Sequence, residues 1–166
     1  MLAAAGPHKF VLDTNCFVDA SRNDDEAEAL AEFSTWAAPG LYLSTVVAAE
    51  LSAGAGSAKH RRTLERQILS PYIQRGRLVN PSPAAWETLG TTLAALVEKE
   101  GLVLREVRRS FVVDILIARS CREIGATLVS RNSTDLCRIA KVFSFDFVAP
   151  YPVQGERRNR RLTLIN

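Results

Sequence analysis

The stretch Lys9–Asn15, KFVLDTN, decides the fold class of this 166-residue chain. Its first four residues form a short apolar run, which predicts a buried β-strand over 9–12. The run stops at Asp13-Thr14-Asn15, which predicts a polar turn where the chain leaves the sheet. A buried strand at this place is the first element of the alternating pattern of strands and helices that follows along the chain.

Further along the chain, short apolar runs alternate with segments of helical periodicity. The other predicted strands are 41–43, 77–79, 127–129 and 146–148, and the predicted helices are 24–38, 45–53, 58–69, 83–100, 110–124 and 133–141. We expect Pro71 to end the third of these helices and Ser110 to cap the fifth. In the fourth, Trp86 and Val97 are expected to face the core. This order predicts an α/β fold, a three-layer α/β/α sandwich with a central, mainly parallel sheet of 4–5 strands. It also predicts one domain over 9–150, followed by a basic C-terminal tail over 151–166.

The composition places the chain among globular proteins. Hydrophobic residues make up 47% and charged residues 23%, and both values are close to the averages for such proteins. No apolar run approaches the roughly 20 residues of a membrane-spanning helix, and residues 1–8 lack the features of a signal peptide. Three cysteines cannot form a disulfide framework or a four-thiolate zinc site. We therefore expect a cytoplasmic protein that does not associate with membranes.

Charge is divided unevenly along the chain. Residues 1–55 carry two basic and eight acidic residues, a net charge of −6, whereas residues 56–166 carry nineteen basic and ten acidic residues, a net charge of +9. Such a division is compatible with a polyanionic partner, and also with a solvated surface of uneven sign.

Four acidic residues lie at strand ends or among apolar neighbours in helices. Asp13 follows the first strand and Asp135 follows the fourth, whereas Glu50 and Asp114 lie in apolar stretches of helices. A carboxylate in such surroundings costs free energy unless it is paired or binds a cation. Taken alone, each has a structural explanation: a turn hydrogen bond, a surface ion pair or a favourable helix dipole. Together they occupy comparable places at the carboxyl edge of the sheet, so we expect one cluster.

A cluster of four carboxylates indicates a hard divalent cation. The charges would repel one another, so some groups would stay protonated unless a cation joined them. Carboxylate oxygens favour Mg²⁺ or Mn²⁺ over zinc, and neither histidine, His8 or His60, is next to an acid in the sequence. Such a site suits phosphodiester hydrolysis by an activated water, without a covalent nucleophile.

At this point the residues resemble the successive motifs of a PIN domain. The matching stretches are Val11–Asn15, Glu50 within Val-Ala-Ala-Glu-Leu, Asp114–Ala118 and Leu128–Asp135. The resemblance spans about residues 9–150. Among PIN domains the chain is most similar to VapC-type toxins of type II toxin–antitoxin systems.

The resemblance implies a ribonuclease that depends on Mg²⁺ or Mn²⁺, forms a homodimer and is inhibited by a cognate antitoxin. The acidic site that it implies, catalytic and metal-binding, consists of Asp13, Glu50, Asp114 and Asp135. The residues that would support this site by hydrogen bonds are Thr14, Asn15, Ser130 and Asn132. Two positions depart from the family pattern: Ser130 stands where threonine is common, and Leu136 where phenylalanine is common.

Five arginines near the elements that carry Asp114 and Asp135 are candidates to contact RNA phosphates. They are Arg105, Arg108, Arg109, Arg131 and Arg138. The alternative for Arg108 and Arg109 is a merely solvated face.

Two other functions compete with a nuclease. A haloacid-dehalogenase-like phosphatase also begins with a strand and an aspartate, but it needs a second acid two residues later, where this chain has Asn15. A non-catalytic nucleic-acid-binding module would suit the basic second part of the chain, but not four intact acids. Cys16 lies beside the site without a neighbouring base, so we expect it to pack in the core rather than act as a nucleophile.

Overall fold

Five parallel strands form the centre of the computed structural model, which describes residues 7–154. The strands are β1 (Lys9–Leu12), β2 (Leu41–Ser44), β3 (Leu78–Val79), β4 (Ala126–Val129) and β5 (Asp146–Val148). Their order in the sheet is β3-β2-β1-β4-β5, and every pair is parallel. The chain thus builds the sheet outward on one side of β1 and then returns to build the other side from β4.

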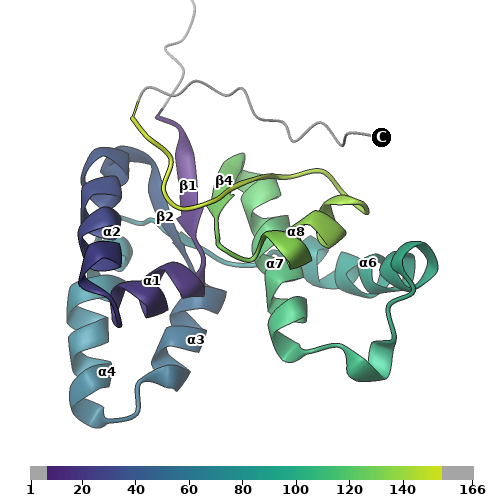
Figure 1. Cartoon of the computed structure of the whole chain (residues 1–166), viewed down its shortest axis with the longest axis horizontal. Coiled ribbons are helices and arrows are strands. Elements are labelled where there is room, and N and C mark those ends of the chain that lie inside the picture. Colours follow the sequence, from purple (N-terminus) through teal and green to yellow (C-terminus); the bar gives the residue numbers. More distant parts are fainter. Residues whose placement is uncertain (1–6, 155–166) are drawn as a thin grey trace, which may run out of the picture.

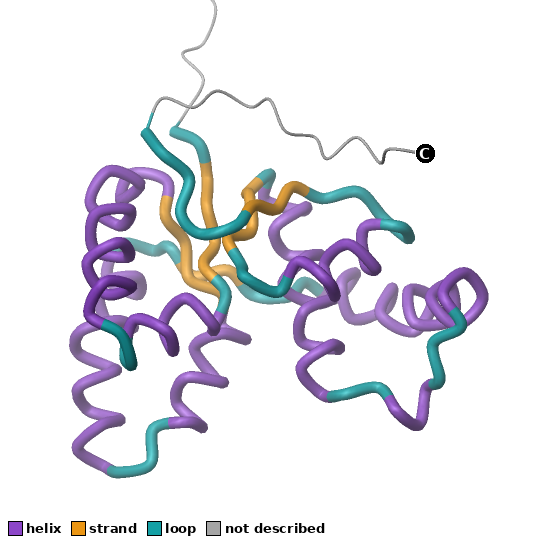
Figure 2. Tube along the Cα trace, viewed as in Figure 1, coloured by secondary structure: helices purple, strands orange, loops and turns teal. Residues whose placement is uncertain are grey.

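Helices cover both faces of this sheet, which confirms the predicted three-layer α/β/α architecture. They are α1 (Thr14–Ala20), α2 (Asp24–Ala37), α3 (Thr45–Gly54), α4 (Ala58–Leu64), α5 (Ser70–Gln74), α6 (Pro83–Glu100), α7 (Arg109–Ile124) and α8 (Ser133–Ala140). Figure 1 shows α1, α2 and α4 to the left of the strands and α6, α7 and α8 to the right. The strands form the thin layer between these two groups (Figure 2).

The core lies on both faces of β1 and β4. Val11 and Leu12 of β1 and all four residues of β4 are buried. Helix α7 packs against these two strands, and its Ile115 and Ile117 are almost completely buried. Burial on both faces explains why the strand sequences are continuously apolar.

The end of β1 differs from the predicted polar turn, because helix α1 begins there without a loop. The carboxylate of Asp13 accepts a hydrogen bond from the backbone N–H of Thr14, and Asp13 is the N-cap of α1. The helix has only seven residues, of which Cys16 and Phe17 are buried. It is too short for a periodic apolar pattern to be visible in the sequence.

Pro71 does not end a helix, contrary to the prediction. The helical path continues from α4 through a π-helical segment, Glu65–Leu69, into α5, which contains the proline. The N–H of Ser70 bonds to the carbonyl of Glu65, five residues earlier. This wider turn displaces the carbonyls that a proline ring would meet in a regular α-helix, so the helix tolerates the proline.

The predictions for α6 and α7 are also wrong in two details. Trp86 is 56% exposed and Val97 is 38% exposed. Helix α6 buries Ala85 and Leu96 instead, and each exposed residue directly follows one of these two in the sequence, so it lies about 100° further round the helix. Helix α7 begins at Arg109, with Arg108 rather than Ser110 at its N-cap. The predicted tail falls largely outside the described residues, which end at 154. Within the described part, no helix has the length and apolar character needed to cross a membrane.

Candidate active site

The site lies where the strand order reverses, between β1 and β4. In open α/β sheets this switch point, at the carboxyl ends of the strands, is where ligands bind. Asp13 follows β1 and is 5% exposed. Its Oδ2 accepts hydrogen bonds from Asn15 Nδ2 at 2.7 Å and from Ser130 Oγ, just after β4, at 2.5 Å. The first acid is therefore held by donors from both strands of the switch point.

Glu50 reaches the same place from α3, the helix that follows β2. Thr14 Oγ1 donates to Glu50 Oε2 at 2.5 Å, while the Thr14 N–H donates to Asp13 Oδ1 at 2.7 Å. One threonine thus links two of the four predicted acids. Glu50 is half-buried rather than buried, so it forms the more solvated side of the cluster.

Asp114 and Asp135 are joined by a single amide. Asn132 Nδ2 donates to Asp114 Oδ2 at 2.9 Å and to Asp135 Oδ2 at 3.0 Å. The N–H of Asn132 donates to Ser130 Oγ at 3.0 Å, which connects this pair to Asp13. The structure therefore brings all four predicted acids and all four predicted supporting residues into one hydrogen-bond network.

Burial and like charge perturb the acids. Burial raises the pKa of Asp114 to about 7, with further contributions from the charges of Asp13, Asp135 and Glu50, and the bond from Asn132 opposes this only in part. Burial also raises the pKa of Asp13, although the bonds from Ser130 and Thr14 favour its ionised form. A neutral donor network holds these carboxylates in place but does not cancel their repulsion.

The donor set fits a hard divalent cation. Clustered, buried carboxylates whose ionisation is opposed by their neighbours supply the oxygen ligands and the negative charge that Mg²⁺ or Mn²⁺ needs. Among residues 7–154, no group of three or more His, Cys, Asp or Glu side chains is placed to hold a metal ion. Mg²⁺ usually keeps several of its waters and binds only one or two protein carboxylates directly, so the cluster would hold it without direct contact from all four acids.

The predicted arginines do not share one environment. Arg108 Nη2 lies 3.1 Å from Asp135 Oδ2, and the Arg108 side chain is 72% exposed, so it borders the acids from the solvent side. Arg131 instead forms ion pairs with Asp19 of α1 and Glu26 of α2. The ion pair between Arg108 and Asp135 was not predicted, because no local pattern signals a contact between positions 27 residues apart.

The other three arginines have other neighbours. Arg105 is 3.8 Å from Glu106, its neighbour, and both are exposed. The Arg138 guanidinium lies over the Phe111 ring, 5.3 Å from its centroid. Arg109 lines a separate surface pocket between α3, α6 and α7. None of the three forms a hydrogen bond or ion pair with a predicted site acid.

Cys16 packs in the core beside the site, as expected. It is completely buried, and burial and the charge of Asp13 raise the pKa of its thiol to about 12. The thiol donates weak hydrogen bonds to Asn15 Oδ1 and to the carbonyl of Val129. A thiol in this state is not a nucleophile at neutral pH.

The fold and the site together define a class of protein: an α/β/α domain with a parallel sheet and a cluster of acidic residues at the carboxyl ends of its central strands. The model of one family, described as "PIN domain", matches residues 10–142. The chain belongs to the PIN domain family.

Solved structures with the same fold include two of VapBC proteins and one of FitAcB. A DNA-bound VapBC from Salmonella typhimurium superposes with a TM-score of 0.63 at 22% identity, covering 86% of this chain and 98% of that one. FitAcB from Neisseria gonorrhoeae gives a TM-score of 0.61 at 17% identity, covering 87% and 99%. VapBC2 from Rickettsia felis, bound to a fragment of promoter DNA, gives 0.56 at 21% identity, covering 84% and 97%. No curated protein matches the chain by sequence. At these identities the likeness shows the fold.

Replacing Asp114 with Asn removes a buried charge and changes the pH dependence of stability. Because the pKa of Asp114 is raised in the folded state, the folded protein binds this proton more tightly than the unfolded chain, whose aspartate titrates near 3.8. The wild type should therefore lose stability as pH rises from about 4 to about 7. In EDTA, we expect D114N to melt at a higher temperature than the wild type at pH 8, with the difference shrinking toward pH 4.

Thermal melts across this pH range measure the effect. The control is Asp25→Asn, on the exposed face of α2. A D114N variant that is less stable than the wild type at pH 8 would show that Asp114 is a structural anchor instead.

Proposed function

We propose that this protein is a metal-dependent ribonuclease that hydrolyses phosphodiester bonds with an activated water. The observation that carries the proposal is the network that joins Asp13, Glu50, Asp114 and Asp135 at the switch point of the sheet. A divalent cation, Mg²⁺ or Mn²⁺, would make water nucleophilic at neutral pH and stabilise the charge that develops on the phosphate. Membership of the PIN family supports this proposal, since PIN domains generally use divalent metal ions.

The residues of the chain have distinct roles in this proposal. The four carboxylates would hold the cation, directly or through its waters, and would orient the attacking water by accepting hydrogen bonds from it. The donors from Thr14, Asn15, Ser130 and Asn132 fix the rotamers of the carboxylates before substrate arrives, so that little reorganisation is needed during the reaction. Because water attacks rather than the ribose 2′-hydroxyl, the products carry a 5′-phosphate and a 3′-hydroxyl.

Loss of one carboxylate should abolish cleavage while the fold survives. With Mg²⁺ or Mn²⁺ and a structured RNA, we expect the wild type to cleave and EDTA to stop it. Asp13→Asn should lower the cleavage rate at least roughly 100-fold, because the ion loses a ligand charge. Circular dichroism and thermal melting show whether the variant is folded, and end-group analysis identifies the products.

Two results would contradict the proposal. Cleavage that continues in EDTA, or products that end in a cyclic phosphate, would show a metal-free mechanism. Tight RNA binding without cleavage in either metal would favour the alternative, a non-catalytic nucleic-acid-binding module.

Arg108 is the basic residue best placed to hold substrate. Its guanidinium reaches Asp135 yet remains 72% exposed, so it can contact a phosphate bound at the edge of the acids. Its neighbour Arg109 lines a different pocket, together with Thr45, Trp86 and Val112. The two adjacent arginines therefore provide a matched pair.

We expect Arg108→Gln to weaken RNA binding and to lower the slope of log affinity against log salt by about one. Arg109→Gln changes net charge equally but should leave both quantities nearly unchanged. Binding is measured with the inactive Asp13→Asn background at several salt concentrations. Equal effects of the two substitutions would mean that only the net charge matters.

We also propose that the protein is the toxin of a toxin–antitoxin pair, acting in the cytoplasm where its RNA substrate would be. The resemblance of the motifs to VapC-type toxins and the fold shared with two VapBC structures support this. A surface pocket of about 270 Å³ between α2 and α5 offers a place for an antitoxin segment. Phe17, Leu30 and Ile68 supply its apolar lining and Arg75 lies at its rim, so an apolar segment that carries an acidic residue fits it.

A second exposed apolar face supports the proposed homodimer. Val46 of α3, Trp86 of α6 and Val113 of α7 line a pocket of about 500 Å³, and Trp86 is 56% exposed. Exposed tryptophan is enriched where proteins meet. This face is separate from the pocket between α2 and α5, so a dimer would leave the antitoxin segment room to bind.

Expression in a bacterial host with and without the product of the adjacent gene tests both assemblies. We expect growth arrest that requires Asp13 and that the partner relieves, together with co-purification of the two proteins. Light scattering should give a dimer for the Asp13→Asn chain alone and a larger complex with the partner. Harmless expression of an active enzyme with no co-purifying partner would leave a PIN-domain nuclease outside any toxin–antitoxin system.

A further inference from the structure

Arg131 lies in the chain between the two residues that organise the acidic site. Ser130 donates to Asp13, and Asn132 donates to both Asp114 and Asp135. The position of the loop over 130–132 therefore decides whether these carboxylates are held together. The loop contains no regular secondary structure that would fix its conformation by itself.

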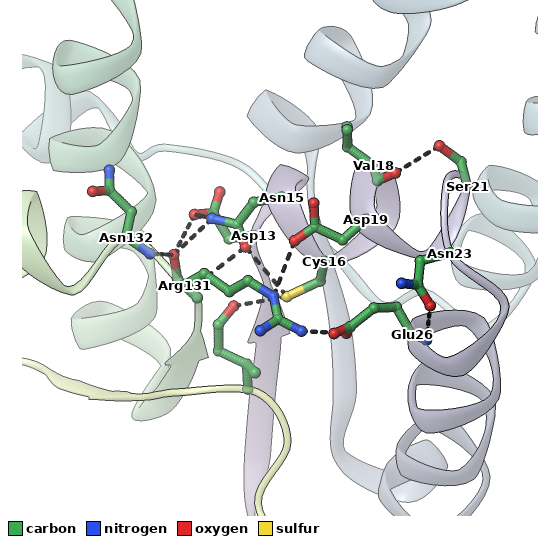
Figure 3. A network of polar contacts seen from close by, with 12 residues as sticks. Asp13, Asn15, Cys16, Val18, Asp19, Ser21, Asn23, Glu26, Arg131 and Asn132 are labelled. Atoms are coloured by element: carbon green, nitrogen blue, oxygen red, sulfur yellow. Dashed lines mark hydrogen bonds and ion pairs between the residues drawn. The ribbon is translucent and has the colours of Figure 1, made fainter.

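The Arg131 side chain extends from its loop towards Asp19 and Glu26 on the first two helices, as Figure 3 shows. Its Nε lies 3.0 Å from Asp19 Oδ2 on α1, and its Nη2 pairs with Glu26 Oε2 on α2. The N–H of Arg131 donates to Asn15 Oδ1 at 3.2 Å. Backbone and side chain of one residue thus bind three residues on the first two helices.

The two acidic partners are themselves held in place. The N–H of Glu26 donates to Oδ1 of Asn23, the N-cap of α2, and the carbonyl of Asp19 accepts from the N–H groups of Arg22 and Asn23 in the turn between the helices. The planar guanidinium of Arg131 offers donors in two directions, and each direction meets one carboxylate. The result is an anchor between the α1–α2 pair and the loop that follows β4.

These contacts also oppose a direct role in RNA binding. Two carboxylates neutralise the charge of Arg131, and a phosphate that approached it would be repelled by Asp19 and Glu26. Arg108, by contrast, has one carboxylate partner and a mostly exposed side chain. Arg131 was expected among the RNA-binding arginines, and its surroundings favour a different role.

We propose that Arg131 is a positioning residue, which anchors the loop over 130–132 to α1 and α2 so that Ser130 and Asn132 hold the site carboxylates in register. This inference rests on the proposed nuclease function for its kinetic consequence, but not for its structural one. An outer hydrogen-bond partner of a metal-binding residue typically contributes about 10–100-fold to metal affinity or activity.

The test compares the arginine with its two acidic partners. Arg131→Met keeps the aliphatic stem and removes the anchor, and Asp19→Asn/Glu26→Gln weakens the anchor by removing both negative charges while keeping the arginine. We expect both to lower kcat about 10-fold, with KM within about twofold of the wild type and an unchanged salt slope. Both should weaken Mn²⁺ binding and speed hydrogen exchange of the amides of residues 131 and 132. Arg131→Lys retains the charge but not the planar guanidinium with its several donors, so we expect each of its losses to be smaller than those of Arg131→Met.

The control is Asp25→Asn/Glu28→Gln, which removes two acids from the exposed face of α2 and changes net charge as much as the partner variant does. It should behave as the wild type in every measurement. If Arg131→Met fails to fold, the partner variant, which retains the arginine, decides the question.

A role in RNA binding predicts effects of opposite sign. Arg131→Met would then raise KM and reduce the salt slope at constant kcat, and Asp19→Asn/Glu26→Gln would lower KM because it frees the arginine. That pattern overturns the proposal, as do unchanged exchange at 131 and 132 and unchanged Mn²⁺ affinity in both variants. If the wild type cleaves no RNA, the proposed function fails, while hydrogen exchange still decides whether Arg131 anchors the loop.

Discussion

Burial of the Asp13 carboxylate at the carboxyl end of β1 is the constraint on which the rest of the site depends. A carboxylate removed from water must have hydrogen-bond donors, and Asp13 obtains them from Thr14, Asn15 and Ser130. Two of these residues begin α1, and the third follows β4. Satisfying this one group therefore determines how the chain leaves β1 and where the neighbouring strand must end.

The donors around the acids orient them without neutralising them. Thr14, Ser130 and Asn132 are all uncharged, so the network fixes oxygen positions without supplying a compensating charge. Burial, and then the charges of the neighbouring acids, raise the pKa of Asp114. A site organised in this way is stable enough to be preformed and negative enough to attract a cation. Buried, mutually repelling carboxylates lower the stability of the fold, and the same concentration of negative charge is what would suit the site to a divalent cation.

The distribution of charge along the chain acquires a meaning in three dimensions. Two of the acids in the first 55 residues, Asp19 and Glu26, bind Arg131 across the sheet. From the basic second part of the chain, Arg108 approaches the acids from solvent, whereas Arg131 ties the two layers together. Arginines that are equivalent in composition thus have different surroundings, since one is exposed beside the acids and the other is paired with two carboxylates.

The sequence by itself determined the five strands, most helix boundaries, the parallel three-layer fold and the four acids at one edge, because these follow from local periodicity, strand ends and the rules of parallel sheets. Tertiary structure alone decided that α1 follows β1 directly, that the helix continues past Pro71 through a π-helical turn, and that Trp86 is exposed. It also decided which arginine meets which acid. Such outcomes depend on contacts between residues far apart in the chain, whose energies are comparable to the local preferences that they override, and no local pattern encodes them.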